Sequence, residues 1–210
     1  MKALEQKEIN ELLIKYKIPL PIHEIVKTEN EIYKAAKKIK YPVVLKIISN
    51  SISHKSDVGG VKINIKDEKE LKEAYKDITN SVPNSKIDLF LVQKHYEGHY
   101  VIIGMKQDKQ FGPVLMFGLG GVFVEILNDV SFRIAPVTQK DAKEMIKEIK
   151  SYKILEGARG TKKANIKILT QILIKISKLS LENEEIKELD LNPIVINDLE
   201  AVTVDVRMFR

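Results

Sequence analysis

The 210-residue sequence contains no cysteine, no tryptophan and only four arginines. The absence of cysteine excludes disulfide bonds, thiolate metal sites and a cysteine nucleophile. No apolar run is long enough to cross a bilayer, and the N-terminal stretch lacks the apolar core of a signal peptide because its leucines are interrupted by charges. The sequence therefore predicts a cytoplasmic protein with no membrane segment.

The net charge of +6 arises from 35 basic and 29 acidic residues, and all but four of the basic residues are lysine. Proteins that bind nucleic acids favour arginine forks and aromatic stacking surfaces. Aromatic residues make up only 6% of this chain. We therefore interpret the lysines as a solvated surface and expect no nucleic-acid partner.

Helix-like and strand-like patterns alternate along the chain, which is typical of an α/β or α+β fold. Thr28 is followed three residues later by Glu31, a capping box that predicts the start of a helix. Apolar periodicity predicts helices over residues 5–16, 28–39, 66–81, 139–150 and 164–181. Strands are predicted over residues 41–48 and 61–65, on both sides of Glu97–Gly98, and in a terminal hairpin around Asn197–Asp198. We expect two lobes, residues 1–95 and 96–210.

Lys46 lies in the middle of the apolar strand over residues 41–48. Its ammonium needs an anionic partner such as phosphate if it is buried, whereas on an edge strand it would reach water. The following loop holds His54, Lys55, Ser56 and the pair Gly59–Gly60. Paired glycines allow backbone amides to approach a phosphate closely. These residues alone fit both a phosphate-binding loop and a decorated hairpin.

Asp190 and Asn192 are two residues apart on a predicted strand, so both should point to one face. The terminal hairpin brings Asp205 back alongside them. Two carboxylates and an amide oxygen suit a hard cation such as Mg²⁺ that is shared with phosphates. The alternative is the solvated edge of a hairpin.

A glycine-rich turn, Gly118–Gly121, separates two apolar segments and is followed by Arg133. Its spacing fits neither the dinucleotide-binding fingerprint nor the Walker motif. Tight packing of the backbone would explain the glycines equally well.

Several of these segments together resemble the ATP-grasp fold, and more closely the β subunits of ADP-forming acyl-CoA synthetases, which are relatives of succinyl-CoA synthetase. The resembling segments are YPVVLKI, HKSDVGGVKINI, FGPVLMFGLGGVFVEILNDVSFRIAP, ILEGARG and ELDLNPIVI with VDVR. The resemblance implies an α+β fold of two α/β lobes with the nucleotide site between them. It implies an acetate–CoA ligase activity that converts acyl-CoA, ADP and phosphate into acid, CoA and ATP through phosphohistidine intermediates. It further implies Mg²⁺, ATP or ADP as substrate, and an α subunit that carries the CoA-binding and phosphohistidine domains, in an α2β2 assembly.

The resemblance also assigns roles to residues. Lys46 would bind nucleotide phosphate, and His54 would relay phosphate between a histidine of the α subunit and ADP. Asp190, Asn192 and Asp205 would hold Mg²⁺. The remaining implied contacts are the loop over the phosphates (His54, Lys55, Ser56, Gly59, Gly60), the adenine-binding hinge (Gln93, Lys94, Tyr96), and the phosphate-transfer path at the partner interface (Gly120, Gly121, Arg133).

One position departs from the family pattern, which usually has a glutamate near the ribose where this sequence has Tyr100. We therefore expect Tyr100 to affect nucleotide affinity or nucleotide choice. The residues also leave two other functions open. A stand-alone carboxylate ligase working through an acyl phosphate would not need His54, and a nucleotide-binding regulatory module without turnover would tolerate Tyr100.

Overall fold

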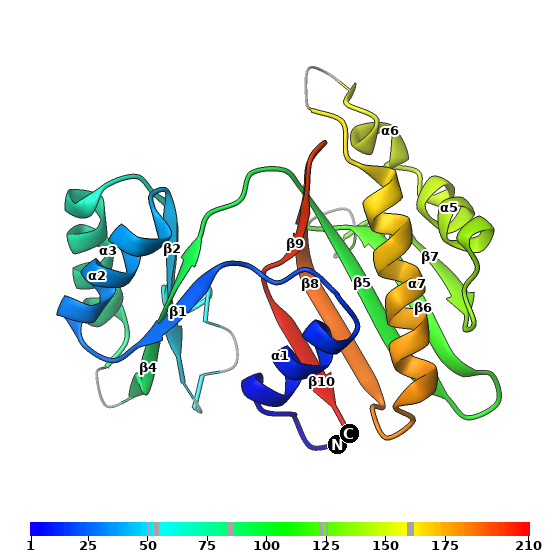
Figure 1. The fold of residues 1–210 in the computed structure, drawn as a ribbon, viewed down its shortest axis with the longest axis horizontal. Helices are drawn as coiled ribbons and strands as arrows, with labels where there is room; N and C mark the ends of the chain where they lie inside the picture. The colour runs from blue at the N-terminus through cyan, green and yellow to red at the C-terminus, as the bar shows by residue number, and fades with distance from the viewer. Residues whose placement is uncertain (50, 53–54, 84–85, 122–123, 125, 159–161) are drawn as a thin grey trace. The chain divides into compact units, whose positions relative to one another are not determined.

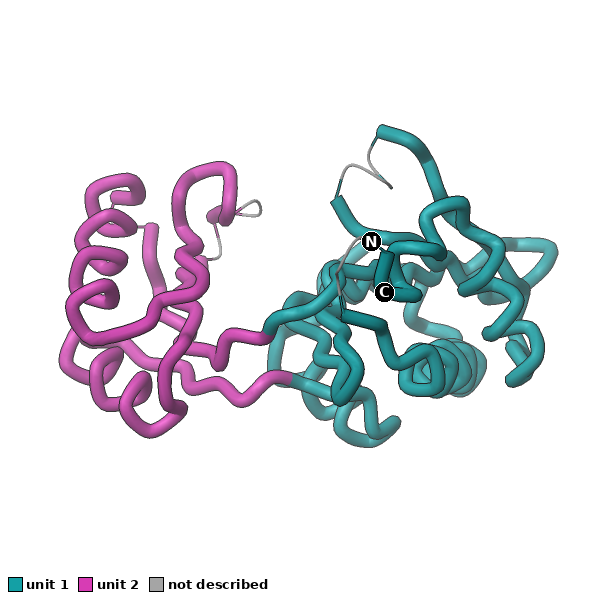
Figure 2. The backbone as a smooth tube through the Cα atoms, turned by 90° about the horizontal axis from the view of Figure 1, so that it is seen from above, with its two compact units in different colours: residues 1–20, 97–210 teal, residues 21–96 magenta. Residues whose placement is uncertain are grey.

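The computed structural model describes the whole chain apart from residues 50, 53–54, 84–85, 122–123, 125 and 159–161. Its residues form two compact units (Figure 1, Figure 2): Met1–Leu20 with Glu97–Arg210 make up unit 1, and Pro21–Tyr96 make up unit 2. Each unit has its own sheet and its own hydrophobic core.

The first twenty residues belong to unit 1, which differs from the division into 1–95 and 96–210 expected from the sequence. Helix α1 (Gln6–Lys15) buries Ile9 and Leu13 in the core of unit 1. Directly after this helix, the Tyr16 hydroxyl donates a 2.7 Å hydrogen bond to Glu182. The sequence shows that α1 is amphipathic, but amphipathicity does not say which of two cores the apolar face joins.

Unit 2 is a four-stranded antiparallel sheet with two helices packed on it. The strands, in the spatial order β1-β4-β2-β3, are β1 (His23–Val26), β4 (Leu89–Lys94), β2 (Val43–Ile48) and β3 (Val61–Ile65). The helices are α2 (Glu29–Ile39), which begins at the predicted capping box of Thr28, and α3 (Glu68–Ser81). Leu45 and Ile47 of β2 are buried in the core that includes α2 and α3. Lys46 lies between them and therefore points to the other face of the sheet.

Unit 1 contains a six-stranded sheet in the order β10-β8-β5-β6-β7, with β9 paired to β8. The strands are β5 (His99–Asp108), β6 (Gly112–Leu119), β7 (Val130–Ile134), β8 (Glu188–Ile196), β9 (Ala201–Thr203) and β10 (Val206–Phe209). The helices that follow β7 are α5 (Gln139–Glu148), α6 (Tyr152–Leu155) and α7 (Ile166–Glu182). Helices α5 and α7 cover one face of this sheet (Figure 1). We call the opposite side of the sheet the open face.

Residues of β5 alternate between the two faces of the sheet. Val101, Ile103 and Met105 are buried in the core with residues of α5 and α7. The other residues of this alternation point to the open face: Tyr100, Ile102, Gly104 and Lys106. The open face therefore carries polar as well as apolar residues and is not covered by α5 and α7. We expect a ligand site on this face.

The two ends of the chain pair with each other. The amide of Lys2 donates to the carbonyl of Arg210 at 2.7 Å, and the amide of Arg210 donates back to Lys2 at 2.9 Å. The amide of Leu4 donates to Met208 at 2.9 Å. The N-terminal residues therefore lie along β10 and occupy backbone groups at that edge of the sheet.

Most predicted elements are present, and the strands β1, β6 and β7 are additional to the predicted ranges. Helix α6 was not predicted, because four residues are too few to show a period. The last predicted strand is broken at residues 204–205 into β9 and β10. No helix among the residues that the structure describes is long and apolar enough to cross a membrane.

Candidate functional site

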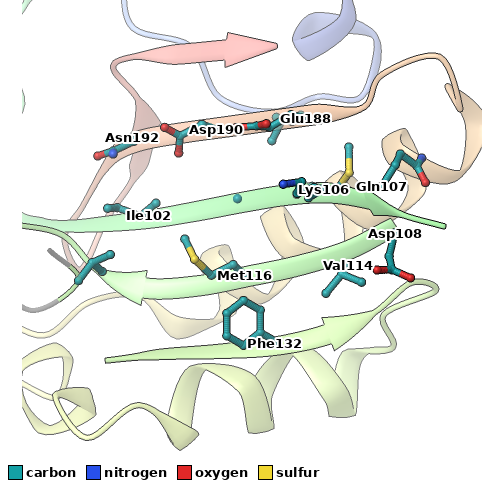
Figure 3. Close-up of a pocket in the computed structure, with 14 residues that line it drawn as sticks. Ile102, Lys106, Gln107, Asp108, Val114, Met116, Phe132, Glu188, Asp190 and Asn192 are labelled. Atoms are coloured by element: carbon teal, nitrogen blue, oxygen red, sulfur yellow. The ribbon is translucent and has the colours of Figure 1, made fainter. Parts of the chain in front are cut away.

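The open face of unit 1 contains a pocket of about 570 Å³ (Figure 3). Gly104 lines this pocket and is paired with Asp190 of β8 and Met116 of β6. A Cβ atom on Gly104 would lie 3.4 Å from Cε of Met116, so the missing side chain leaves part of the hollow. Its apolar lining comes mainly from Ile102, Val114, Met116, Val124 and Phe132, and its polar lining from Lys106, Gln107, Asp108, Glu188, Asp190 and Asn192.

The structure brings together the three residues of the predicted metal site. Asp190 and Asn192 both line the pocket from β8, as their spacing predicts. The amide of Asn192 donates a 3.1 Å hydrogen bond to the carbonyl of Asp205. The Asp205 side chain accepts a 3.0 Å hydrogen bond from the amide of Val206. Backbone pairing thus holds the segment that carries Asp205 next to β8, which carries Asp190 and Asn192.

Burial raises the pKa of the half-buried Asp190 above its ordinary value. The neighbouring Asp205 carboxylate acts in the same direction, whereas the charge of Arg207 and a hydrogen bond from Asn192 act against it. An ionised Asp190 therefore carries a free-energy cost in the free chain. A bound cation would relieve that cost.

The donor set consists of two carboxylates and one amide oxygen, which is the ligand chemistry that Mg²⁺ prefers. No group of three or more His, Asp or Glu side chains in the described part of the chain is arranged to hold a metal ion. Asp190, Asn192 and Asp205 offer three oxygen ligands, so an octahedral cation would take its other ligands from phosphate or water.

The predicted phosphate loop belongs to unit 2 and packs against β2. The amide of Ile47 donates to the carbonyl of Gly60 at 3.0 Å. A Cβ atom on Gly60 would lie 2.6 Å from Cδ1 of Ile47, and Gly59 has a φ of +73°. The amides of Gly59 and Gly60 donate to the carbonyls of Ser56 and Lys55, at 3.1 and 2.8 Å. The glycine pair thus closes a tight turn with these two amides.

Of Lys46 and His54, the structure describes only Lys46. Lys46 is half-buried on the face of the sheet away from α2 and α3. His54 lies outside the residues that the structure describes.

The predicted hinge segment contains Gln93, which is buried, followed by Lys94 and Tyr96. The amide of Lys94 donates to the carbonyl of Ile22 at 2.9 Å, and the Tyr96 hydroxyl accepts from the amide of Ile22 at 3.3 Å. The Lys94 ammonium lies 5.3 Å from the centre of the Tyr96 ring. These contacts tie the end of β4 to the residues before β1.

Tyr100 lies on the open face of unit 1, with 46% of its surface exposed. Its carbonyl accepts a 2.8 Å hydrogen bond from the amide of Gly120. A Cβ atom on Gly120 would lie 3.2 Å from Cβ of Tyr100, so glycine permits this close approach. The next residue, Gly121, has a φ of +70°. The glycine-rich turn is therefore explained by close backbone packing and turn geometry.

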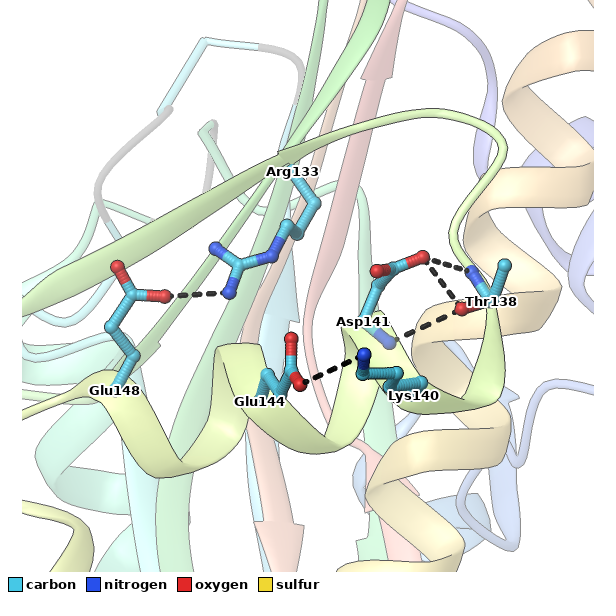
Figure 4. Close-up of polar contacts among 6 residues, drawn as sticks. All are labelled: Arg133, Thr138, Lys140, Asp141, Glu144 and Glu148. Carbon is cyan, nitrogen blue, oxygen red and sulfur yellow. Dashed lines mark hydrogen bonds and ion pairs between the residues drawn. The ribbon is translucent and has the colours of Figure 1, made fainter.

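Arg133 is not placed with Asp190 and Asn192. Its guanidinium forms a 2.7 Å ion pair with Glu148 of α5 (Figure 4). It also donates a 2.7 Å hydrogen bond to the carbonyl of Phe132. Phe132, the preceding residue on β7, lines the pocket. Because neighbouring residues of a strand point to opposite faces, Arg133 lies on the α5 side of the sheet.

Sequence reasoning missed the apolar part of the pocket. Gly104, Met116 and Phe132 lie on three adjacent strands, and only the strand register places them side by side. The available signal was the alternation of the segments VIIGMK and GPVLMF. It could have assigned residues to faces, but not neighbours across strands.

Comparisons with known proteins identify relatives over nearly the whole chain. A model of the ATP-grasp domain family matches residues 1–209. The chain is 50% identical to the β subunit of acetate–CoA ligase (ADP-forming) I from Pyrococcus furiosus, over 99% of this chain and 91% of that protein. It is 46% identical to acetate–CoA ligase (ADP-forming) I from Archaeoglobus fulgidus, over 92% of this chain and 29% of that longer protein.

Solved structures show the same fold. Acetyl-coenzyme A synthetase 1 from Ca. Korarchaeum cryptofilum, in complex with coenzyme A, Ca-AMPCP and HgCl+, matches with a TM-score of 0.91 and 44% identity, over 99% of this chain and 93% of that chain. Another structure of that protein contains Mg-AMPPCP and a phosphohistidine segment pointing towards the nucleotide binding site. It matches with a TM-score of 0.84 and 42% identity, over 99% of this chain and 92% of that chain. The expected α+β fold with two sheets is confirmed.

Proposed function

Because the chain belongs to the ATP-grasp family, we propose that it is the nucleotide-binding β subunit of an ADP-forming acetate–CoA or acyl-CoA ligase. The observation that carries this proposal is the 50% identity to a β subunit of that activity, over 99% of this chain and 91% of the relative. The complete enzyme would convert acyl-CoA, ADP and phosphate into the free acid, CoA and ATP. The relative's subunit name favours this reading over a stand-alone carboxylate ligase or a regulatory module.

On the open face of unit 1, Asp190, Asn192 and Asp205 are the proposed ligands of Mg²⁺. When bound, Mg²⁺ neutralises charge on the nucleotide phosphates. Asp190 and Asn192 share their pocket with Met116 and Phe132. These apolar side chains would limit the access of water, which strengthens electrostatic interactions with a bound phosphate and reduces hydrolysis.

In unit 2, the Lys46 ammonium is the proposed contact to a nucleotide phosphate, because its strand position directs it away from the apolar core. Lys55 and Ser56 follow it at the turn closed by Gly59 and Gly60. The proposed nucleobase contacts are Gln93, Lys94 and Tyr96, with Tyr100 offering a phenol ring where relatives are expected to offer a carboxylate.

His54 is the proposed carrier of the phosphoryl group. A neutral imidazole nitrogen would accept phosphate from a phosphohistidine of the α subunit, so that one N–P bond breaks as the other forms. A terminal oxygen of ADP would then attack the same phosphorus, releasing the neutral imidazole and forming ATP. Both steps transfer one phosphoryl group without net oxidation or reduction.

The proposed partner is an α subunit that supplies the acyl-CoA chemistry. The name of the Pyrococcus furiosus relative, a β subunit, implies an α subunit in that enzyme. We propose an α2β2 assembly in the cytoplasm for this protein. Gly120, Gly121 and Arg133 are the residues of this chain proposed to lie near that partner.

The proposal is tested with the purified chain, alone and together with the α subunit of its own source. The chain alone should bind Mg–ADP or Mg–ATP in calorimetry and should form no ATP from acyl-CoA, ADP and phosphate. Adding the α subunit should restore ATP formation. Sustained turnover by the chain alone, or none with the α subunit present, would contradict the proposal.

A further inference from the structure

Asp129 is a buried carboxylate that the proposed reaction does not use. It directly precedes β7 and is only 7% exposed. One of its oxygens accepts the amide of Lys150 and the other accepts the amide of Ser151, each at 2.7 Å. A buried carboxylate is tolerated when hydrogen bonds of this kind replace water. Both oxygens are therefore committed to the backbone of one segment.

That segment is the turn between α5 and α6. Helix α5 ends at Glu148, and the amide of Tyr152 donates to the carbonyl of Ile149 at 3.1 Å. Lys150 and Ser151 are the two central residues of this turn. The Asp129 carboxylate thus attaches the start of β7 to a fixed point between two helices.

On its other side, Asp129 lies close to the pocket wall, which includes Val124. The Val124 side chain packs on Gly118, where a Cβ atom would lie 2.7 Å from Cγ2 of Val124 and 3.1 Å from the carbonyl oxygen of Asp129. The amide of Asn128 donates to the carbonyl of Val124 at 3.3 Å. Val124 and Asp129 thus both pack on Gly118, so a shift of Asp129 would be passed to Val124 through this contact.

We propose that Asp129 is a positioning residue for phosphoryl transfer: its carboxylate fixes the Val124 wall of the pocket against the α5–α6 turn. The inference rests on the proposed function, because it assigns the pocket to the transferred phosphate. Phosphoryl transfer depends on alignment of the attacking and leaving atoms, so a small displacement of the wall reduces the rate even when nucleotide still binds.

The first test is Asp129→Asn, with Asp141→Asn as the matched control. Both aspartates bind backbone amides at an end of α5, but Asp141 caps the N-terminal end through Thr138 and is remote in sequence from the pocket wall (Figure 4). Asn keeps the shape of Asp129 while turning one acceptor into a donor that faces an amide. The rate of phosphoryl transfer per folded molecule should fall by about 10- to 100-fold, with the Kd for Mg–ADP unchanged. Asp141→Asn should lower Tm and leave the transfer rate unchanged.

The second test removes one hydrogen bond from the other side, in case Asp129→Asn fails to fold. Lys150→Pro lacks the amide that binds Asp129, and Lys150→Ala retains it. Proline is compatible with this position, because Lys150 follows the extended Ile149 (φ −66°, ψ 139°) and is the second residue of the turn. The proline variant should reduce the transfer rate and increase hydrogen exchange at the amides of residues 126–130, whereas the alanine variant should do neither.

A transfer rate per folded molecule that stays at the wild-type value in either Asp129→Asn or Lys150→Pro would overturn the proposal, since Asp129 would then serve stability alone. Equal loss of rate in Lys150→Ala would overturn it as well, because the side chain and not the amide would be responsible. Failure of the proposed function is distinguishable: the wild-type chain with its α subunit would then show no transfer.

Discussion

Arg133 and Glu148 form a 2.7 Å ion pair that holds the guanidinium on the α5 side of the sheet, while the adjacent Phe132 lines the pocket. This separation predicts that Arg133 acts on the partner and not on the nucleotide. Arg133→Ala should leave the Kd for Mg–ATP of the isolated chain unchanged, and should weaken association with the α subunit, measured by calorimetric titration.

Glu148→Gln is the control for this prediction. The Glu148 side chain is 54% exposed, and ion pairs of this kind contribute little to stability. The variant should therefore keep the wild-type Tm and the wild-type nucleotide affinity. Weaker nucleotide binding in Arg133→Ala would show that the guanidinium leaves Glu148 and reaches the ligand.

Asp190→Asn should raise stability and lower affinity. Burial raises the pKa of Asp190, so the folded chain disfavours its ionised form and loses stability as pH rises through that pKa. Asparagine resembles the protonated acid, so Tm at pH 7 should rise by a few degrees while Mg–ATP binds about tenfold or more weakly. Differential scanning calorimetry and titration calorimetry measure the two effects. A lower Tm would show that Asp190 stabilises the free chain through Arg207.

His54→Asn tests the phosphate relay, and it rests on the sequence because His54 lies outside the described residues. Asparagine is polar but cannot carry phosphate. Nucleotide binding should survive, and transfer from the α subunit to ADP should fall by several orders of magnitude. Labelled phosphate should appear on the wild-type chain in an acid-labile, base-stable form and be absent from the variant. ATP formation by the variant at the wild-type rate would mean that the partner's histidine transfers phosphate directly to ADP.

Gly98 and Gly104 should respond differently to alanine. A Cβ atom on Gly98 would lie 2.2 Å from the carbonyl oxygen of Ile196, so the backbone of β5 or β8 must move. Gly98→Ala should lower the free energy of unfolding by about 1–3 kcal/mol in urea titrations. In Gly104→Ala, the new Cβ atom would lie at an ordinary contact distance of 3.4 Å from Cε of Met116. This variant should stay close to wild-type stability while reducing the volume of the pocket.

Acid should destabilise unit 1 through Asp129. Burial acts to raise the pKa of Asp129, but hydrogen bonds from Ser151 and Lys150 outweigh it, so the pKa lies below its ordinary value. The contribution of Asp129 to stability is complete above the unfolded pKa of about 4 and is lost as pH falls through the lower folded pKa. Asp129→Asn should therefore flatten the dependence of Tm on pH below about 4. A curve parallel to the wild type would assign acid sensitivity to other carboxylates.

Local patterns predicted much of this fold from sequence. The capping box at Thr28 marks the start of α2, and the spacing of Asp190 and Asn192 places both on one face of β8. Each of these signals depends on residues a few positions apart. Element type and face are decided at that range by backbone geometry and burial.

Long-range relationships were not predictable in the same way. Nothing near Arg133 in the sequence indicates that it forms an ion pair with Glu148 of α5. The role of Asp129 depends on two backbone amides, which no side-chain motif records. Strand order and register decide such contacts, and both emerge only when the sheet is assembled.

The reciprocal bonds between Lys2 and Arg210 make this polypeptide almost a closed ring. A short linker joining residues 1 and 210 would cross little space, and new ends could be opened in the exposed turn around Asp198 and Leu199. Such a circular permutant should keep the fold, and a protein fused to residue 1 or to residue 210 would leave the sheet from the same edge. A further domain could therefore be joined before residue 1 or after residue 210 with little effect on the folding of this region.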